Sequence, residues 1–161
     1  MSTESKPSRL EAPAGRAAIE AAIPHRDPFL LVSEVLEIDE QSILTRWTVP
    51  ADADWTAGHY PGQPITPGVL LCEHAVQSGA LLVSRNLAGF DEADGVPVLT
   101  KLSDARFRKM VLPGQTVETR VEVTDRVGPA WILKARVMLE GKRAVELSCT
   151  LTAAGAMART S

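Results

Sequence analysis

The hydrophobic residues of this chain form one long run with few charges, from Val69 to Val83, and fall into shorter segments elsewhere. The run follows Pro67 and continues to about Asn86, with Gly89 available to end it, which is the pattern of a long helix. Because this helix is apolar on nearly all sides, it is expected to lie inside the domain rather than on its surface.

Strand patterns lie on both sides of this helix. The alternation is clearest over 117–123, where apolar and polar residues exchange with a period of two. The predicted strands cover 29–38 and 43–49 before the helix, and 98–107, 117–123, 131–139 and 144–152 after it. Residues 140–143 separate the last two strands and predict a hairpin turn. In the final strand, the side chains expected to face the core are Val145, Leu147, Cys149 and Leu151.

These elements predict an α+β domain in which about five or six antiparallel strands wrap a long buried helix. A short helix over 15–23, ended by Pro24, precedes the first strand. A chain of 161 residues is typical of one domain. We expect that domain to cover 15–155, with 1–14 as a flexible N-terminal tail.

Composition and charge exclude several classes of function. The net charge of −3 gives no basic face for nucleic-acid binding, and the apolar stretches are too interrupted to span a membrane. Cys72 and Cys149 lie in apolar runs and are expected to be buried thiols rather than a disulfide. The histidines and cysteines have no metal-ligand spacing, so no metal is expected. The start of the chain lacks the apolar core of a secretory signal, and we expect a soluble, cytoplasmic protein.

Candidate chemistry gathers where a proline-rich loop meets the long helix. His59 lies in a segment, 51–67, that is stiffened by prolines at 61, 64 and 67. Thr66 is a suitable N-cap for the helix. Glu73 falls inside the apolar run, where a carboxylate costs free energy unless it is paired, hydrogen-bonded or protonated. An imidazole and a carboxyl group are the raw material of acid–base catalysis.

Each of these residues also has a structural interpretation. Glu73 is either a catalytic acid or a structural carboxylate bonded to Gln77 or to a strand, and a lone loop histidine is commonly a surface residue. The sequence does not show that His59 and Glu73 meet. Gly68 and Val69 offer backbone N–H groups at the helix start, which would stabilise a developing oxyanion. Gly68 is equally compatible with close packing.

Other charged or titratable residues have simpler interpretations. His74 points away from Glu73 around the helix and is expected to be a packed or interface histidine. His25 is expected to order its turn rather than to react. Arg106, Arg108 and Lys109 form either the solvated side of a strand or a positive edge that docks an acidic carrier.

Several motifs, in order over about 19–152, resemble those of the 3-hydroxyacyl-[acyl carrier protein] dehydratases of the FabZ type. They are Ile23–Val32 (IPHRDPFLLV), Gly58–Leu70 (GHYPGQPITPGVL), Glu73–Gln77 (EHAVQ), and Ala105–Arg108 with Val111–Gly114. The resemblance implies a hot-dog fold and a homodimer with active sites shared between subunits, with a trimer of dimers as a larger assembly. It also implies that His59 and Glu73 come from opposite subunits of the dimer.

The implied reaction removes water from a 3-hydroxyacyl chain on acyl carrier protein to give the trans-2-enoyl thioester, in fatty-acid or related lipid or polyketide biosynthesis. His59 would take the C2 proton, Glu73 would assist departure of the hydroxyl, and the N–H of Gly68 or Val69 would bind the thioester carbonyl. No cofactor is implied. The chain departs from the family pattern at Ser33-Glu34, Thr66, His74 and Gln115. Two alternatives stay open: a hot-dog thioesterase, and a non-catalytic acyl-binding subunit.

Overall fold

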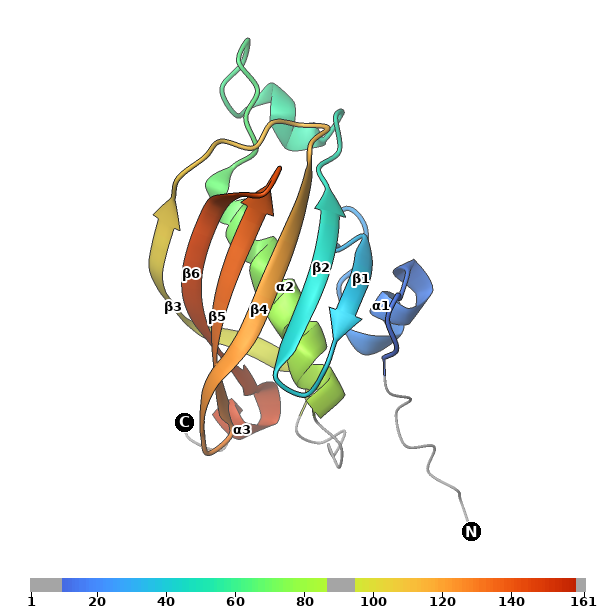
Figure 1. The fold of residues 1–161 in the computed structure, drawn as a ribbon, viewed down its shortest axis with the longest axis vertical. Coiled ribbons are helices and arrows are strands. Elements are labelled where there is room, and N and C mark those ends of the chain that lie inside the picture. Colours follow the sequence, from blue (N-terminus) through green and yellow to red (C-terminus); the bar gives the residue numbers. More distant parts are fainter. Residues whose placement is uncertain (1–9, 87–94, 159–161) are drawn as a thin grey trace.

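A long helix lies against one face of a single six-stranded sheet (Figure 1). The structure is a computed structural model and describes residues 10–86 and 95–158. In chain order the elements are α1 (Arg16–Ala22), β1 (Glu34–Ile38), β2 (Ser42–Thr48), the 3-10 helix η1 (Asp54–Ala57), α2 (Gly68–Asn86), β3 (Pro97–Phe107), β4 (Thr116–Val127), β5 (Ala130–Leu139), β6 (Lys142–Ala153) and α3 (Ala154–Ala158). The predicted α+β architecture is confirmed.

The strand order explains how the sheet encloses α2. The order is β1-β2-β4-β5-β6-β3, and every neighbouring pair is antiparallel. β3 follows α2 in the chain but lies at the edge opposite β1, and α2 lies behind the sheet (Figure 1). As a result α2 packs against β2, β3, β4, β5 and β6.

The core lies between α2 and the inner face of the sheet. The four side chains of β6 that were predicted to face inward are all buried, as are alternate residues of β5 from Trp131 to Leu139. From α2, Leu81 and Leu82 are fully buried. Ser78 is also buried there, and its hydroxyl lies 2.7 Å from the Thr45 hydroxyl on β2, so this polar side chain of the helix has a partner in the core.

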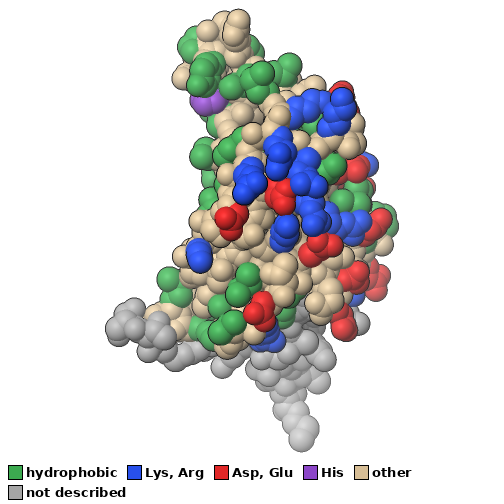
Figure 2. Space-filling view, turned by 60° about the vertical axis from the view of Figure 1, so that its left-hand side comes forward, with side chains coloured by type: hydrophobic (Ala, Val, Ile, Leu, Met, Phe, Trp, Pro, Cys, Tyr) green, Lys and Arg blue, Asp and Glu red, His purple; other side chains and the backbone are tan. Residues whose placement is uncertain are grey.

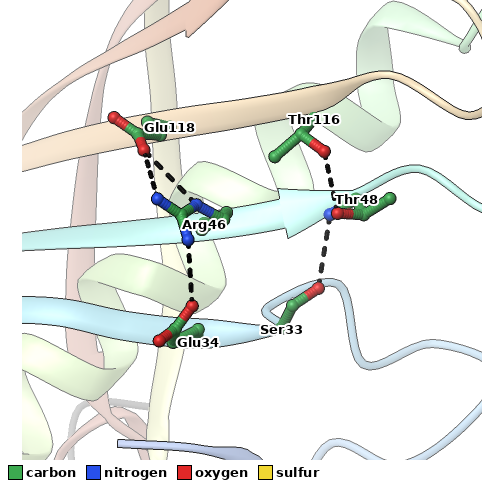
Figure 3. Close-up of polar contacts among 6 residues, drawn as sticks. All are labelled: Ser33, Glu34, Arg46, Thr48, Thr116 and Glu118. Atoms are coloured by element: carbon green, nitrogen blue, oxygen red, sulfur yellow. Dashed lines mark hydrogen bonds and ion pairs between the residues drawn. The ribbon is translucent and has the colours of Figure 1, made fainter. Parts of the chain in front are cut away.

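The outer face of the sheet carries cross-strand polar pairs that match the strand register. Arg46 lies opposite Glu34 on β1 and Glu118 on β4. Its guanidinium contacts both carboxylates, at 3.2 Å and 2.8 Å (Figure 3). Beside it the hydroxyls of Thr48 and Thr116 lie 2.9 Å apart. Cross-strand pairs of this kind favour one register over a slipped one.

The predicted hairpin between the last two strands is confirmed. β5 ends at Leu139 and β6 begins at Lys142, which leaves a two-residue turn of Glu140 and Gly141. Both turn residues have positive φ, 50° and 74°. This conformation matches the twist of the two strands, and Gly141 adopts it without a steric penalty.

Several predicted boundaries differ from the structure, among them the end of β4, which continues to Val127 instead of ending at 123. The predicted strand over 29–38 begins only at Glu34, because backbone groups of Phe29 and Leu31 bond to side chains of α2 instead of a neighbouring strand. Residues 1–9 of the predicted tail lie outside the described residues. Ala14, however, exchanges backbone hydrogen bonds with Val35, so the end of that tail is attached to β1. The short α3 was not predicted.

Candidate active site

The loop that carries His59 is fixed at both ends and in its middle. Val49 donates its N–H to Gln115 O and accepts from Gly114 N, while Thr66 N donates to Val111 O at 2.7 Å. Inside the loop, η1 precedes His59, whose N–H bonds to Trp55 O at 3.0 Å. These bonds agree with the expectation that the 51–67 segment is not a floppy connector.

The side chain of His59 is half-buried at one end of the molecule. Its ring meets the Tyr60 ring edge-on, with centroids 4.9 Å apart and an interplanar angle of 87°. Tyr60 has φ of 52° and Gly62 has φ of 87°, so the backbone turns sharply directly after His59. Tyr60 is itself 63% exposed, which leaves the His59–Tyr60 pair accessible from outside the chain.

The start of α2 differs from the prediction in one respect. Thr66 Oγ1 is buried and, within the described part of the chain, has no hydrogen-bond partner, so the prediction that the Thr66 side chain caps α2 is wrong. Leu70 donates its N–H to Pro67 O at 3.0 Å. The N–H groups of Gly68 and Val69 precede the first regular helical bond and lie at the positive end of the helix dipole.

Gly68 packs closely against β3. A Cβ atom at Gly68 would lie 2.7 Å from Cε1 of Phe107, closer than carbon atoms approach each other. The structural interpretation of Gly68, close packing, is therefore confirmed. The neighbouring Val69 is 72% exposed, so this end of the helix faces outward.

Glu73 lies one turn further along α2, and its side chain is partly exposed, at 24%. Gln77 Nε2 donates to Glu73 Oε1 at 3.0 Å, as the structural interpretation of Glu73 anticipated. The same amide donates to Phe29 O at 2.8 Å, and Gln77 Oε1 accepts from Leu31 N at 2.8 Å. A carboxylate that is held on one side and open on the other is suited to act on a substrate.

The sequence did not predict that His25 lies beside Glu73 in the site. Its Nε2 lies 3.6 Å from Glu73 Oε1, across 48 positions of the chain. It was expected only to order its turn. A signal was present, because His25 lies in the first of the family motifs, but no local periodicity relates a turn residue to a helix so distant in sequence.

His74 is fully buried, and its prediction as a packed histidine is confirmed. Nδ1 lies 2.7 Å from Leu31 O, and the ring packs against Trp47 with centroids 5.6 Å apart. Burial lowers the pKa of His74 to about 4, although the bond to Leu31 raises it in part. The residue therefore fastens the 29–31 segment to α2 as an uncharged side chain.

The three cations predicted at the β3 end differ in their surroundings. Lys109 Nζ lies 3.5 Å from Glu140 Oε2, so it already has an acidic partner. Arg106 and Arg108 are exposed and, among the described residues, make no ion pair. Figure 2 shows Lys and Arg side chains gathered on this face, with Asp and Glu side chains among them, below the hydrophobic side chains at its upper end.

Within one chain, His59 and Glu73 have different neighbours. His59 contacts residues of its own loop, whereas Glu73 contacts His25 and Gln77. Among the residues that the structure describes, no three His, Cys, Asp or Glu side chains lie close enough together to hold a metal ion. In the same residues no helix is sufficiently long and apolar to cross a membrane.

Comparison with known proteins identifies the family to which this chain belongs. A model of the FabA-like domain matches residues 23–148. The 3-hydroxyacyl-[acyl-carrier-protein] dehydratase FabZ of Rickettsia akari is 37% identical over 129 residues, covering 80% of this chain and 88% of the relative. The FabZ of an Anaeromyxobacter species is 35% identical over 131 residues, covering 80% and 83%. This chain belongs to the FabZ family.

Solved structures agree with this membership at the level of the fold. The dehydratase heterocomplex ApeI:P from Xenorhabdus doucetiae aligns with a TM-score of 0.70 at 14% identity, covering 84% of this chain and 90% of the other. A hypothetical thioesterase from Streptococcus pneumoniae, solved with coenzyme A, aligns with a TM-score of 0.59 at 14% identity, covering 76% and 85%. The hot-dog fold expected of a FabZ protein is confirmed, whereas the choice between dehydratase and thioesterase chemistry comes from the sequence relatives.

Proposed function

We propose that this protein removes water from a 3-hydroxyacyl thioester carried by acyl carrier protein, with His59 and Glu73 supplied by opposite subunits of a homodimer. His59 takes the proton from C2, and the electron pair of the broken C–H bond forms the C2=C3 double bond. The C3–O bond breaks, and the hydroxyl leaves as water with a proton from Glu73. Exchange with solvent returns His59 and Glu73 to their starting protonation states.

The observation that carries this proposal is the position of Glu73 on the outward side of a buried helix. Val69 and Glu73 are four residues apart on α2 and share one face, which also carries the open N–H groups at the helix start. Charge that develops on a thioester carbonyl would meet the donors of Gly68 and Val69. A hydroxyl on C3, two carbons away from that carbonyl carbon, would then face the carboxyl of Glu73.

The exposed edge of the sheet supports a dimer. β3 pairs with β6 on one side only. It exposes apolar side chains along its length, as does the adjoining segment: Val96 41%, Leu99 42%, Leu102 45%, Phe107 56% and Met110 68%. A long, apolar edge strand is a site of association unless something covers it. A second copy on β3 would cover this edge and bring a second His59 loop toward the α2 face that carries Glu73.

Mixing two inactive variants tests the shared site. His59→Ala and Glu73→Gln are each expected to lower kcat/KM by about a thousandfold, since each removes a proton-transfer group. In a mixture allowed to exchange subunits, half of the dimers are mixed and one of their two sites is intact, so roughly a quarter of the sites recover activity. Failure of the mixture to recover, despite demonstrated exchange, would overturn the sharing of the site between subunits.

Product analysis separates the dehydratase from the thioesterase. Purified protein is incubated with 3-hydroxyacyl thioesters of increasing chain length, and the products are followed by mass spectrometry. We expect enoyl thioester without release of free thiol. Release of thiol at enzymatic rates without enoyl product would replace the proposal with thioester hydrolysis, and absence of turnover on every substrate would favour the acyl-binding subunit.

The carrier is proposed to dock on Arg106 and Arg108. Both cations are exposed on the β3 side, whereas Lys109 already has Glu140 as a partner. Arg106→Gln and Arg108→Gln should raise KM for the acyl carrier protein substrate without changing KM for a short pantetheine thioester. Lys109→Gln is the matched control and should change neither. Light scattering on the purified protein distinguishes a dimer from a trimer of dimers.

A further inference from the structure

Glu73 is approached from two sides by side chains that meet at the same oxygen atom. Gln77 Nε2 lies 3.0 Å from Oε1, and His25 Nε2 lies 3.6 Å from Oε1. We propose that His25 is a positioning residue for Glu73: with Gln77 it holds Oε1, so that Oε2 is the oxygen presented to the substrate. This role rests on the proposed dehydratase function.

The two neighbours make the oxygens of Glu73 unequal. An oxygen that faces two N–H donors is the acceptor oxygen whether the carboxyl group is ionised or protonated. A proton on Glu73 is therefore favoured on Oε2, where it can be passed to the leaving hydroxyl. Without His25, the carboxyl group keeps only the bond from Gln77 and can rotate about its terminal torsion, which is broad for glutamate.

The surroundings of the His25 ring favour one tautomer. Nδ1 is buried and, among the residues that the structure describes, has no hydrogen-bond partner. A hydrogen on Nδ1 would be a buried donor without an acceptor, and the lone pair of Nε2 would then face the Glu73 carboxyl group. A hydrogen on Nε2 instead faces Glu73. The geometry therefore favours the Nε2–H tautomer, with Nε2–H directed toward the carboxyl group at 3.6 Å.

The segment that carries His25 is fastened on both sides of the residue. Arg26 Nη1 donates to Ile23 O at 2.9 Å and to His25 O at 2.7 Å. Asp27 forms an ion pair with Arg16 on α1 at 2.5 Å. The Phe29 carbonyl accepts from Gln77 Nε2, the same group that contacts Glu73. His25 is thus held near Glu73 chiefly by the bonds of Arg26 and by the bond of Phe29 O to α2. The exposed ion pair of Asp27 contributes little to this arrangement.

Variants of His25 whose side chains place an N–H donor at different distances from the backbone test this role. The amide nitrogen of glutamine reaches the place of imidazole Nε2, whereas that of asparagine reaches the place of Nδ1. His25→Ala and His25→Asn should lower kcat by about tenfold to a hundredfold with little change in KM, because a misplaced catalytic group affects the chemical step. His25→Gln should recover most of kcat. Equal kcat values for the Gln and Asn variants, or a kcat for the Ala variant within about twofold of wild type, would overturn the proposal.

Asp27→Asn is the matched control for disturbance of the segment. It removes the ion pair with Arg16 two residues from His25 without touching Glu73. We expect kcat to stay unchanged in this variant, and thermal unfolding of all four variants is measured beside it. A loss of kcat in Asp27→Asn equal to that of His25→Ala would assign the effect to the segment as a whole and overturn the specific role of His25.

A spectroscopic measurement separates this proposal from the dehydratase assignment itself. Long-range proton–nitrogen correlation spectra of the histidine rings report which ring nitrogen carries hydrogen, with or without turnover. We expect His25 to show the Nε2–H pattern and its Nε2 resonance to move in Glu73→Gln, while the resonances of buried His74 stay in place. An Nδ1–H pattern, or no response to Glu73→Gln, would refute the positioning role even in a fully active enzyme. An inactive wild type that shows the expected pattern would refute the dehydratase function alone.

Discussion

Gln77 accepts a hydrogen bond from the backbone N–H of Leu31, at 2.8 Å, across 46 positions of the chain. The bond joins the middle of α2 to the segment before β1. The other end of the same amide contacts Phe29 O and Glu73 Oε1. A single buried side chain therefore connects the fold of the N-terminal segment to the orientation of the candidate catalytic carboxyl group.

Gln77→Leu should destabilise the protein more than most single substitutions. It leaves the buried N–H of Leu31 and the partly buried carbonyl of Phe29 without their partner, and an unsatisfied buried group costs about 1–3 kcal/mol. We expect the free energy of unfolding, measured in urea at fixed protein concentration, to fall by about 2–4 kcal/mol.

Gln115→Ala is the comparison for that measurement. Gln115 Oε1 also accepts a backbone N–H, from Leu112, but this bond is in an exposed turn. Its loss should cost under about 1 kcal/mol, because water replaces the lost partner. Similar losses in the two variants would contradict the importance assigned to the buried bonds of Gln77.

The buried His74 should make stability depend on pH. Its pKa is about 4 in the folded protein against an ordinary value of 6.5, so between these values the unfolded chain binds a proton that the folded chain does not. The stabilisation is present above pH 6.5 and is lost as the pH falls toward 4. It amounts to about 3 kcal/mol over this range. Denaturant unfolding at a series of pH values measures it.

His74→Asn is expected to remove this dependence. Asparagine has no proton to gain, and its amide nitrogen can still donate to Leu31 O in place of Nδ1. The difference in unfolding free energy between wild type and variant should therefore shrink steadily from pH 6.5 to pH 4. Parallel curves for the two proteins would show that His74 is not the group responsible.

Gly79 lies where α2 packs tightly against the sheet, and an added methyl group should be costly. A Cβ atom there would lie 2.7 Å from Leu133 Cδ1 and 3.4 Å from Leu151 Cδ1, both buried. Gly79→Ala should destabilise by about 1–3 kcal/mol despite the better helix propensity of alanine. Gly15→Ala, where nothing lies within 4 Å of the new atom, should change the melting temperature little. A stabilised Gly79→Ala variant would contradict the packing described.

Gly68→Ala should lower activity through Phe107. The new methyl group would lie 2.7 Å from Cε1 and 2.9 Å from Cδ1 of the Phe107 ring, and the helix start or the ring must move. We expect kcat/KM to fall by about tenfold or more, because the N–H groups of this turn are proposed to bind the thioester oxygen. Phe107→Leu in the same chain should restore part of the loss. The absence of any coupling between the two substitutions would refute the explanation.

Much of the fold could be predicted because its signals are local. The alternation in β6 and the apolar run of α2 each lie within one element, so a pattern of period two or 3.6 is enough to identify them. The 29–33 segment was predicted as part of a strand because the sequence over 29–38 is rich in Leu and Val. Its backbone partners, however, are side chains of Gln77 and His74, which no local pattern specifies.

The same distinction applies to the site. His59 and Glu73 were found because a stiff loop and a charge in an apolar run are visible in the sequence. The contact between His25 and Glu73 was not, since it depends on how the segment after α1 packs on α2. Thr66 is a residue type that often caps helices. In the structure, however, its N–H donates to Val111 O and its buried hydroxyl does not bond to the helix, so residue type and position alone do not establish a cap.

The attachments at both ends of the 49–66 segment bear on how the enzyme could diversify. Val49 is bonded to the turn before β4, and Thr66 is bonded to Val111, so neither end depends on what lies between them. Doubling the length of a loop with fixed ends costs only about 0.6 kcal/mol. Insertions and substitutions around His59 are therefore compatible with an unchanged α2, and Glu73 can stay in place while descendants of this chain acquire differently shaped entrances for their acyl substrates.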